Sequence, residues 1–334
     1  MEMHALLDTM AAHAANDALV RLDEIGLPAD KSIRWLYGLA AGLYFADGDA
    51  RRTREAMRGL ALRYYDLAEG NTNVLAFDGG SKRLGTKQVL VDYFDQPAYL
   101  DASNTAGFYL RHRPKGALRS GEPVHDYFTT LLPCTGYRGG NGRLLYQTRL
   151  AELARDPAGV VRFFVDACRE LRVFYAVSGL SLLFATYASS APERAHPVLC
   201  RFPGLLYEDG THFGMEIRHR TDAIRDVNWL TAIDDALLAR VGGLDAARAA
   251  LGDAVVLHPY DGGVVFQAGA MPVLGDLDNG GAPAAYRAVN AFLRPLRLAH
   301  WERPYLRVPH DVDEMAFTDW WTRRFDEEAG GRFR

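Results

Sequence analysis

The sequence has few cysteines and no membrane-spanning run. Its three cysteines, Cys134, Cys168 and Cys200, are odd in number and far apart, which argues against a disulfide framework and against a thiolate metal site. No stretch approaches the roughly 18 consecutive apolar residues that a membrane helix needs. The first residues also lack the basic stretch followed by an apolar one that marks a signal peptide. We therefore expect a cytoplasmic protein that does not enter a membrane.

The sequence also lacks the common catalytic motifs. It contains no His-Glu-x-x-His, Cys-x-x-Cys, Gly-x-Ser-x-Gly or Gly-x-Gly-x-x-Gly pattern. Residues 79–87 resemble a phosphate loop, but Thr86 precedes Lys87, which reverses the order that the loop requires. Ser178 and Ser181 lie in an apolar run, where packing is the better interpretation. We therefore expect no catalytic residue.

No histidine or acidic spacing matches a metal site. His212, His219, His258, His300 and His310 could converge only through the fold, because their spacing fits no ligand motif. Residues 276–280 begin like a calcium loop, but the glycine comes one residue too early and no closing Glu follows. We expect a tight turn there and no bound metal.

The sequence contains enough apolar residues to fill a large core, and its charge is unevenly distributed. Of 334 residues, 49% are hydrophobic and 11% aromatic, which is typical of a folded globular protein. The net charge is −4, yet residues 222–280 carry nine Asp, three Arg and no Glu or Lys, so this segment sums to −6 and the rest to +2. An acidic patch repels nucleic acid and attracts basic surfaces. The alternative is that these Asp residues are helix caps and turn residues.

Periodicity predicts an α+β fold, with antiparallel sheets and packed helices. In the first half we expect strands over residues 33–45, 106–111, 124–132 and 143–150, and helices over residues 1–25, 50–68 and 158–175. A helix is the alternative for residues 33–45, because that run is rich in alanine. Asp47 or Asp49 is expected to cap the second of these helices. Residues 173–185 are expected to be fully buried, with Gly179 allowing close packing.

The second half has the clearer signals. Asp234 is positioned to cap a helix over residues 235–241, and a second helical pattern covers residues 244–251. Asp261-Gly262-Gly263 joins residues 254–258 to residues 264–268, a strong hairpin signal. We also expect a strand over residues 211–218 and a helix over residues 284–293.

These elements suggest three parts. Residues 1–31 form an N-terminal helical extension, residues 32–190 an N-terminal α+β sublobe, and residues 191–334 a C-terminal α+β sublobe with the acidic segment. The two sublobes could be related and could form one compact unit.

Several motifs carry a family resemblance: Asn228-Trp-Leu-Thr231, Gly242-Gly243-Leu244, Gly262 to Gly269, Gly275-Asp276, Tyr286-Arg287, Leu293-Arg-Pro-Leu-Arg297, Arg201-Phe-Pro-Gly204, Trp320-Trp-Thr-Arg-Arg-Phe-Asp326 and, more loosely, Gly42-Leu-Tyr-Phe45. With these motifs, residues 32–326 resemble the type VI secretion immunity proteins for VRR-NUC nucleases. The resemblance implies a protein that binds and neutralises a nuclease toxin, without enzyme activity or cofactor.

The candidate partner-binding residues are carboxylates and aromatics of the C-terminal part. Glu208 and Asp209 follow Tyr207, Asp261 follows Tyr260, and Asp276 and Asp278 lie in a turn; Trp320-Trp321 is a further exposed aromatic candidate. Aromatic anchors and carboxylates suit a basic protein partner, which we expect to be a cognate effector toxin rather than nucleic acid. The alternatives are a hydrolase of unknown substrate and a structural component of the secretion apparatus.

Overall fold

The structure is a computed structural model of the full chain. It describes residues 7–8, 10–12, 27–29, 33–68, 72–77, 79–101, 103, 107–112, 125–131, 140–183, 191–208, 212–327 and 333. Most of the helix expected over residues 1–25, together with Cys134 and Asp209, lies outside these ranges.

Alternating apolar residues produce a long antiparallel sheet. Its strands are β1 (Leu27–Ala29), β2 (Ile33–Phe45), β3 (Val74–Phe77), β4 (Gly80–Arg83), β5 (Phe108–His112), β6 (His125–Leu131), β7 (Gly142–Arg149), β8 (Val173–Leu183), β9 (Leu230–Asp234), β10 (Val255–Tyr260) and β11 (Gly263–Ala268). Among the described residues, the strand order is β10-β11-β9-β8-β2-β7-β6-β5-β3-β4, with β1 paired to β2. The predicted α+β class with antiparallel pairing is confirmed.

The sheet is continuous between the two expected sublobes. β2 pairs with β7 on one side, placing Leu43 opposite Leu144, and with β8 on the other. β8 in turn pairs with β9, so strands from both halves of the chain share one hydrogen-bonded layer. The division into two sublobes at residue 190 remains a prediction. The sheet is continuous across this boundary, because β8 lies before it and β9 after it in the sequence.

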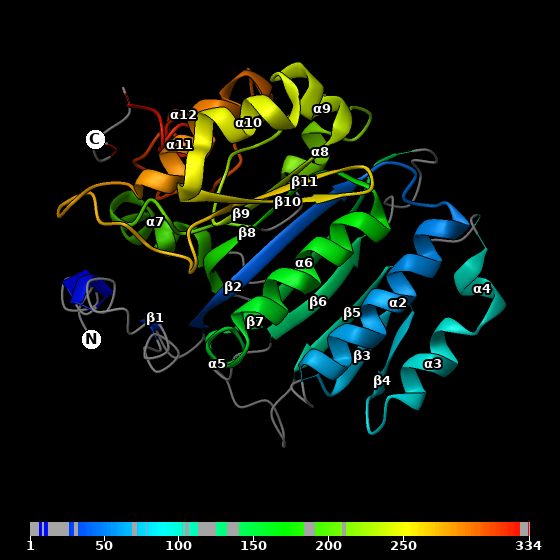
Figure 1. The fold of residues 1–334 in the computed structure, drawn as a ribbon. Helices are drawn as coiled ribbons and strands as arrows, with labels where there is room; N and C mark the ends of the chain where they lie inside the picture. The colour runs from blue at the N-terminus through cyan, green and yellow to red at the C-terminus, as the bar shows by residue number, and fades with distance from the viewer. Residues whose placement is uncertain are drawn as a thin grey trace.

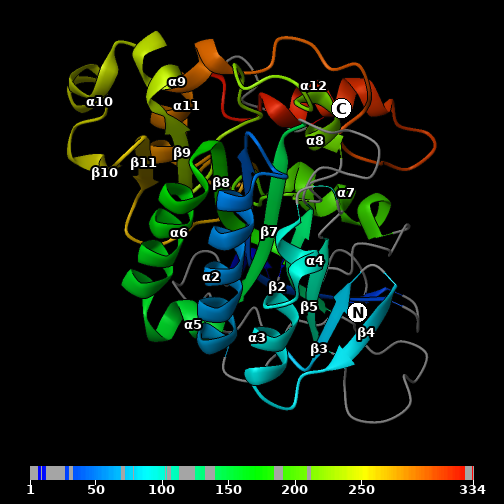
Figure 2. The ribbon, with the colours of Figure 1, turned by 90° about the vertical axis from the view of Figure 1, so that its right-hand side faces the viewer.

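Helices cover the sheet. They are α2 (Arg51–Leu67), α3 (Gln88–Phe94), α4 (Pro97–Leu100), α5 (Leu150–Arg155), α6 (Pro157–Leu171), α7 (Ala191–Arg201), α8 (His212–Glu216), α9 (Asp235–Arg240), α10 (Gly243–Leu251), α11 (Ala284–Leu293) and α12 (Glu314–Thr322), with short 3-10 turns η2 (Gly252–Ala254) and η3 (Arg294–Leu296). α2 and α6 lie side by side on one face of the sheet, and α9 to α12 gather at one end of the molecule (Figures 1 and 2). No helix within the described ranges is long and apolar enough to cross a membrane.

β8 is the centre of the core. All eleven of its residues are buried, which confirms the prediction for residues 173–183; residues 184–185 lie outside the described ranges. A Cβ on Gly179 would lie 1.8 Å from Oδ1 of Asn228, so only glycine lets the Asn228 side chain lie against this strand. The predicted close packing at Gly179 is therefore confirmed.

Three local predictions were wrong. The helix expected to run to residue 175 ends at Leu171, because Arg172 takes a left-handed conformation with φ of 51° and the chain turns into β8. Residues 212–216 form helix α8 instead of a strand. Neither Asp47 nor Asp49 caps α2: the cap residue is Ala50, which makes no side-chain bond there.

The predicted cap of α9 and the predicted hairpin are confirmed. Asp234 caps α9 by accepting a hydrogen bond of 2.8 Å from the Leu237 backbone N–H. The hairpin of β10 and β11 turns at residues 261–262, where Gly262 has a φ of 105° that favours glycine.

Candidate partner-binding site

The turn that contains Asp276 and Asp278 is held from inside by an arginine. Arg201 donates two hydrogen bonds of 3.0 Å to the Asp276 carboxylate, whose side chain is 9% exposed. Asp276 also accepts the Asp278 backbone N–H at 3.0 Å. The Asp278 carboxylate is 39% exposed and lies 3.3 Å from Arg201. Asp276 thus stabilises the turn, and Asp278 is the residue of the two that a partner could reach.

Tyr260 and Asp261 lie at the hairpin turn and face different surroundings. The Tyr260 hydroxyl is buried, and this burial raises its pKa. Asp261 is exposed at the tip. Asp261 lies in the turn between β10 and β11, whereas Asp278 lies beyond the far end of β11 and next to Arg201, the last residue of α7.

Glu208 is a buried carboxylate. Its side chain is 1% exposed and accepts hydrogen bonds of 2.7 Å from both Tyr44 Oη and Arg225 Nη1. Arg225 Nη1 also donates to Tyr305 Oη at 2.5 Å. A Cβ on Gly42 would lie 2.4 Å from Glu208 Oε2, so the carboxylate reaches β2 where that strand has no side chain. Burial keeps Glu208 from contacting a partner directly in this structure.

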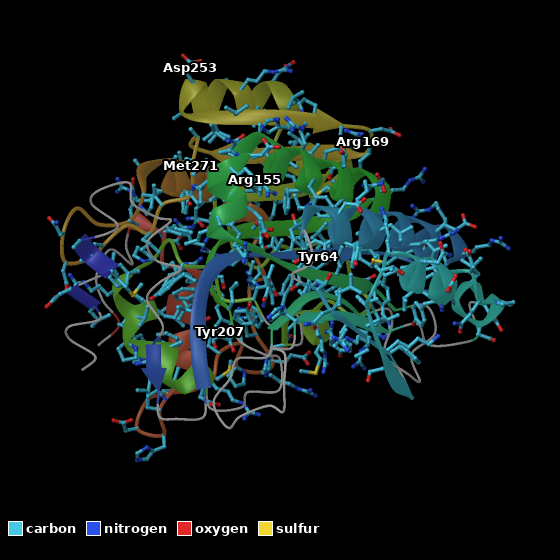
Figure 3. The ribbon with its side chains drawn as sticks, turned by 90° about the horizontal axis from the view of Figure 1, so that it is seen from below. Tyr64, Arg155, Arg169, Tyr207, Asp253 and Met271 are labelled. Carbon is cyan, nitrogen blue, oxygen red and sulfur yellow. The ribbon has the colours of Figure 1, made fainter. Side chains whose placement is uncertain are left out.

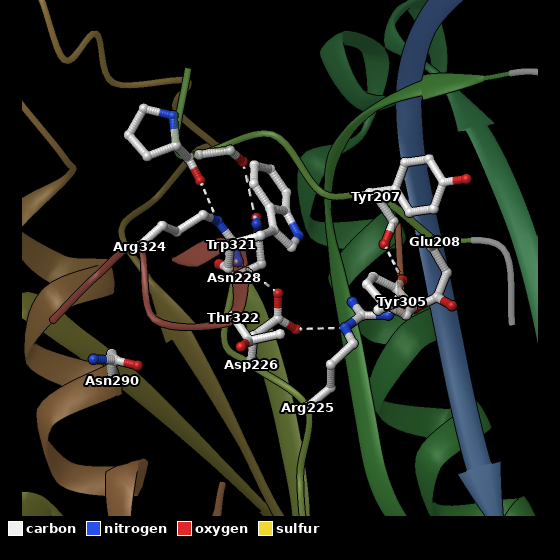
Figure 4. Close-up of polar contacts among 12 residues, drawn as sticks. Tyr207, Glu208, Arg225, Asp226, Asn228, Asn290, Tyr305, Trp321, Thr322 and Arg324 are labelled. Atoms are coloured by element: carbon white, nitrogen blue, oxygen red, sulfur yellow. Dashed lines mark hydrogen bonds and ion pairs between the residues drawn. The ribbon is translucent and has the colours of Figure 1, made fainter. Parts of the chain in front are cut away.

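Asp226 continues this network deeper into the protein. Its carboxylate accepts hydrogen bonds of 2.8 Å from Arg225 Nε and from Arg324 Nη1 (Figure 4). Tyr175 Oη donates to its backbone carbonyl at 2.9 Å. Asp226, Arg225 and Arg324 side chains are all 0% exposed. Burial alone would raise the pKa of Asp226, but the two guanidinium groups outweigh it and hold the pKa below its usual value. The two cations are balanced by the carboxylates of Asp226 and Glu208.

Arg324 joins three distant segments. Its Nε donates to the Pro203 carbonyl at 2.7 Å, and its guanidinium lies 4.0 Å from the ring centroid of Trp321. Asn228 Nδ2 donates to the neighbouring Gly204 carbonyl at 3.1 Å (Figure 4). The motifs of residues 201–204, 228–231 and 320–326, which carry the family resemblance, therefore meet at one buried polar network.

The sequence patterns do not predict this network. The predicted exposure of Tyr207 is wrong, since Tyr207 is 4% exposed, and the candidate partner-binding residue Glu208 beside it has a buried side chain. Trp321 is fully buried as well. The available signal was the pair Arg225-Asp226 between apolar residues, because a charged residue inside an apolar stretch requires a buried partner.

The acidic segment is divided between the interior and the surface. Asp226 and Asp276 are buried in ion pairs, and Asp234 is a helix cap. In contrast, Asp245 is 96% exposed and Asp253 projects from the periphery of the molecule (Figure 3). Part of the acidity is thus structural, and the rest faces solvent.

The described residues do not assemble a metal site. No group of three or more His, Cys, Asp or Glu residues within the described ranges is arranged to hold an ion. His258 instead shares a 2.8 Å hydrogen bond with Gln267. Ser178 and Ser181 are each 2% exposed in β8, consistent with packing. The expected absence of metal and of catalysis remains a prediction.

Comparison with known proteins finds a family match over the part of the chain that contains most of this buried network. The model of the family TsiV, described as type VI immunity for VRR-NUC, matches residues 152–325. Among curated proteins, none matches the chain. Among solved structures, the T6SS protein PA0821 of Pseudomonas aeruginosa is similar, with 21% identity, a TM-score of 0.72, and coverage of 96% of this chain and 92% of that one. At this identity the likeness shows a shared fold.

Proposed function

This chain belongs to the TsiV family of type VI immunity proteins for VRR-NUC, and we propose that it binds a VRR-NUC effector nuclease and neutralises it in the cytoplasm of the producing cell. The family match is the observation that carries the proposal. It covers the segment in which the buried network of Glu208, Arg225, Asp226 and Arg324 lies. A family of immunity proteins also supports a role without catalysis.

The buried network favours inhibition by a preformed surface. Its hydrogen bonds and ion pairs connect Tyr175 of β8 and Arg324, which follows α12, to the loops around residues 203–208 and 225–228. A scaffold held in this way loses little conformational freedom when it binds, which increases affinity. We infer that the network supports the binding surface from below.

We propose that exposed carboxylates of the acidic segment guide the encounter with the effector. A nuclease presents a basic groove to the phosphate backbone of its substrate, and negative charge on the inhibitor attracts such a groove. Asp261 and Asp278 retain this proposed role because their side chains reach solvent. Replacing both with Asn should slow association with the effector at low salt, and the difference should vanish at high salt. An association rate that is unchanged at low salt would remove these two residues from the interface.

The proposal is tested with the VRR-NUC effector of the same genome. Co-expression of this chain should restore growth to cells that produce the effector, and an equimolar amount should abolish DNA cleavage by the purified nuclease. The two proteins should also elute as one complex from size exclusion. Full nuclease activity at a tenfold excess of this chain, with no complex, would refute the proposal.

A further inference from the structure

A basic pocket lies at the end of the molecule where α11 and α12 finish. It has a volume of about 600 Å³, within the range of about 300–1,000 Å³ that is typical of binding pockets. Its lining comes from η3, the residues that follow it, and the residues just after α12. The lining residues are Arg294, Pro295, Arg297, Leu298, Ala299, Arg323 and Asp326.

The charge of this pocket is strongly positive. Three arginines face one carboxylate, giving a net charge of +2. The carboxylate, Asp326, is already bonded inside the protein: Arg297 donates to its two oxygens at 3.0 and 2.6 Å, and Asn290 Nδ2 donates at 2.7 Å. Burial would raise the pKa of Asp326, but these hydrogen bonds outweigh it and lower the pKa, so Asp326 is ionised at neutral pH.

The two other arginines face outward. Arg323 is 47% exposed, and its contact with Asp319 is 3.8 Å long. Arg294 is exposed as well. An exposed ion pair of that length contributes little, so Arg323 can turn to a better acceptor at small cost. Guanidinium groups bind carboxylates and phosphates with two parallel hydrogen bonds, which makes an oxyanion the ligand that fits this pocket.

We propose that this pocket receives a carboxylate side chain of the effector nuclease. The inference rests on the proposed function and adds a contact whose charge is opposite to that of the acidic segment. Paired contacts of opposite sign fix the register of an interface.

A carboxylate fits the surroundings better than a nucleic acid does. The chain carries a net charge of −4, and the pocket itself contains the carboxylate of Asp326. A polyphosphate would bring further negative charges against the chain, whereas a single side chain would enter the pocket alone.

The first test removes the positive charges of the two exposed pocket arginines, Arg294 and Arg323. In the variant Arg294→Gln/Arg323→Gln, the Kd for the effector nuclease should rise at least about tenfold, since hydrogen bonds to charged groups are among the stronger ones. The matched control is Arg51→Gln/Arg162→Gln, which removes two charges from side chains that are 71% and 68% exposed on other helices. Its Kd should stay within about twofold of the parent. Both variants should melt at the temperature of the parent.

The outcomes separate this inference from the proposed function. If the parent protein binds the effector and both double variants bind equally well, the pocket proposal is overturned and the proposed function stands. If the parent protein does not bind, both fall. A pocket variant that binds effector like the parent but loses affinity for a labelled 20-base-pair DNA would show that the pocket takes phosphate, which also overturns the proposal.

A second test identifies the acidic side chain. Arg323→Lys keeps the charge and places an amine at the pocket, in a chain with only four natural lysines at positions 31, 82, 87 and 115. A carbodiimide joins an amine and a carboxylate that already form an ion pair. Mass spectrometry of the complex should then show a cross-link from residue 323 to an Asp or Glu of the effector. A complex that is cross-linked only through the natural lysines would contradict the proposal.

Discussion

Replacing Asp226 with Asn changes the buried network by one charge while keeping its shape. In the native protein two guanidinium groups are balanced by two carboxylates, those of Asp226 and Glu208, and all four side chains are at most 1% exposed. Asp226→Asn leaves two cations against one anion, a net charge of +1 away from water. The amide would also place either an N–H group or a weaker acceptor 2.8 Å from Arg324 Nη1.

The expected cost follows from the burial of this charge. Removing one partner of a buried ion pair costs about 3–5 kcal/mol, because the remaining charge has lost its compensation. At about 2 °C per kcal/mol for a chain of this size, the melting temperature should fall by about 6–10 °C. Urea unfolding followed by tryptophan fluorescence measures this loss, since Trp229 and Trp321 are both fully buried.

Two further variants make the test specific. Asp245→Asn removes a carboxylate that is 96% exposed, and its unfolding free energy should change by no more than about 0.5 kcal/mol. Adding Arg324→Met to Asp226→Asn restores charge balance, so the double variant should lose less than the sum of the two single losses. A loss below about 1 kcal/mol for Asp226→Asn would show that water or side-chain movement compensates the buried charge, and would refute the reasoning.

Three other outcomes are expected. The pKa of Asp226 is lower in the folded than in the unfolded protein. Its ionised carboxylate therefore stabilises the fold above the unfolded pKa of about 3.9, and this contribution is lost as the pH falls below about 4. Acid unfolding followed by circular dichroism should occur at a higher pH in Asp226→Asn than in the parent. Gly179→Ala would place a methyl group 1.8 Å from Asn228 Oδ1 and should cost about 1–3 kcal/mol in urea unfolding; an unchanged midpoint would mean that Asn228 moves freely. Asp234→Ala removes the cap of α9 and should cost about 1 kcal/mol; a Ser variant that is as unstable as the Ala variant would argue against a capping role.

The sequence alone was sufficient to predict those helices and strands that are determined by residues close to one another in the chain. Asp261-Gly262-Gly263 specified the hairpin, because a tight turn needs residues that accept positive φ at fixed positions. Asp234 specified the start of α9, since a cap bonds a backbone group only three residues away. The period of two along residues 33–45 likewise specified β2.

Where periodicity was interrupted, the prediction failed. An apolar run continues from α6 into β8, and the boundary between them is a single left-handed residue, Arg172. Apolar helices and buried strands have similar composition, so the run alone could not locate that boundary.

The roles of the carboxylates depended on residues that are remote in sequence. The same residue type is a helix cap at Asp234, an internal ion pair at Asp276 and a solvent-exposed group at Asp245. Asp226 is ionised inside the protein because Arg324, 98 residues away, is folded against it. Composition established that residues 222–280 are acidic, but only tertiary structure decided which of those charges face solvent, because the energy of a charge depends on the groups that replace its water.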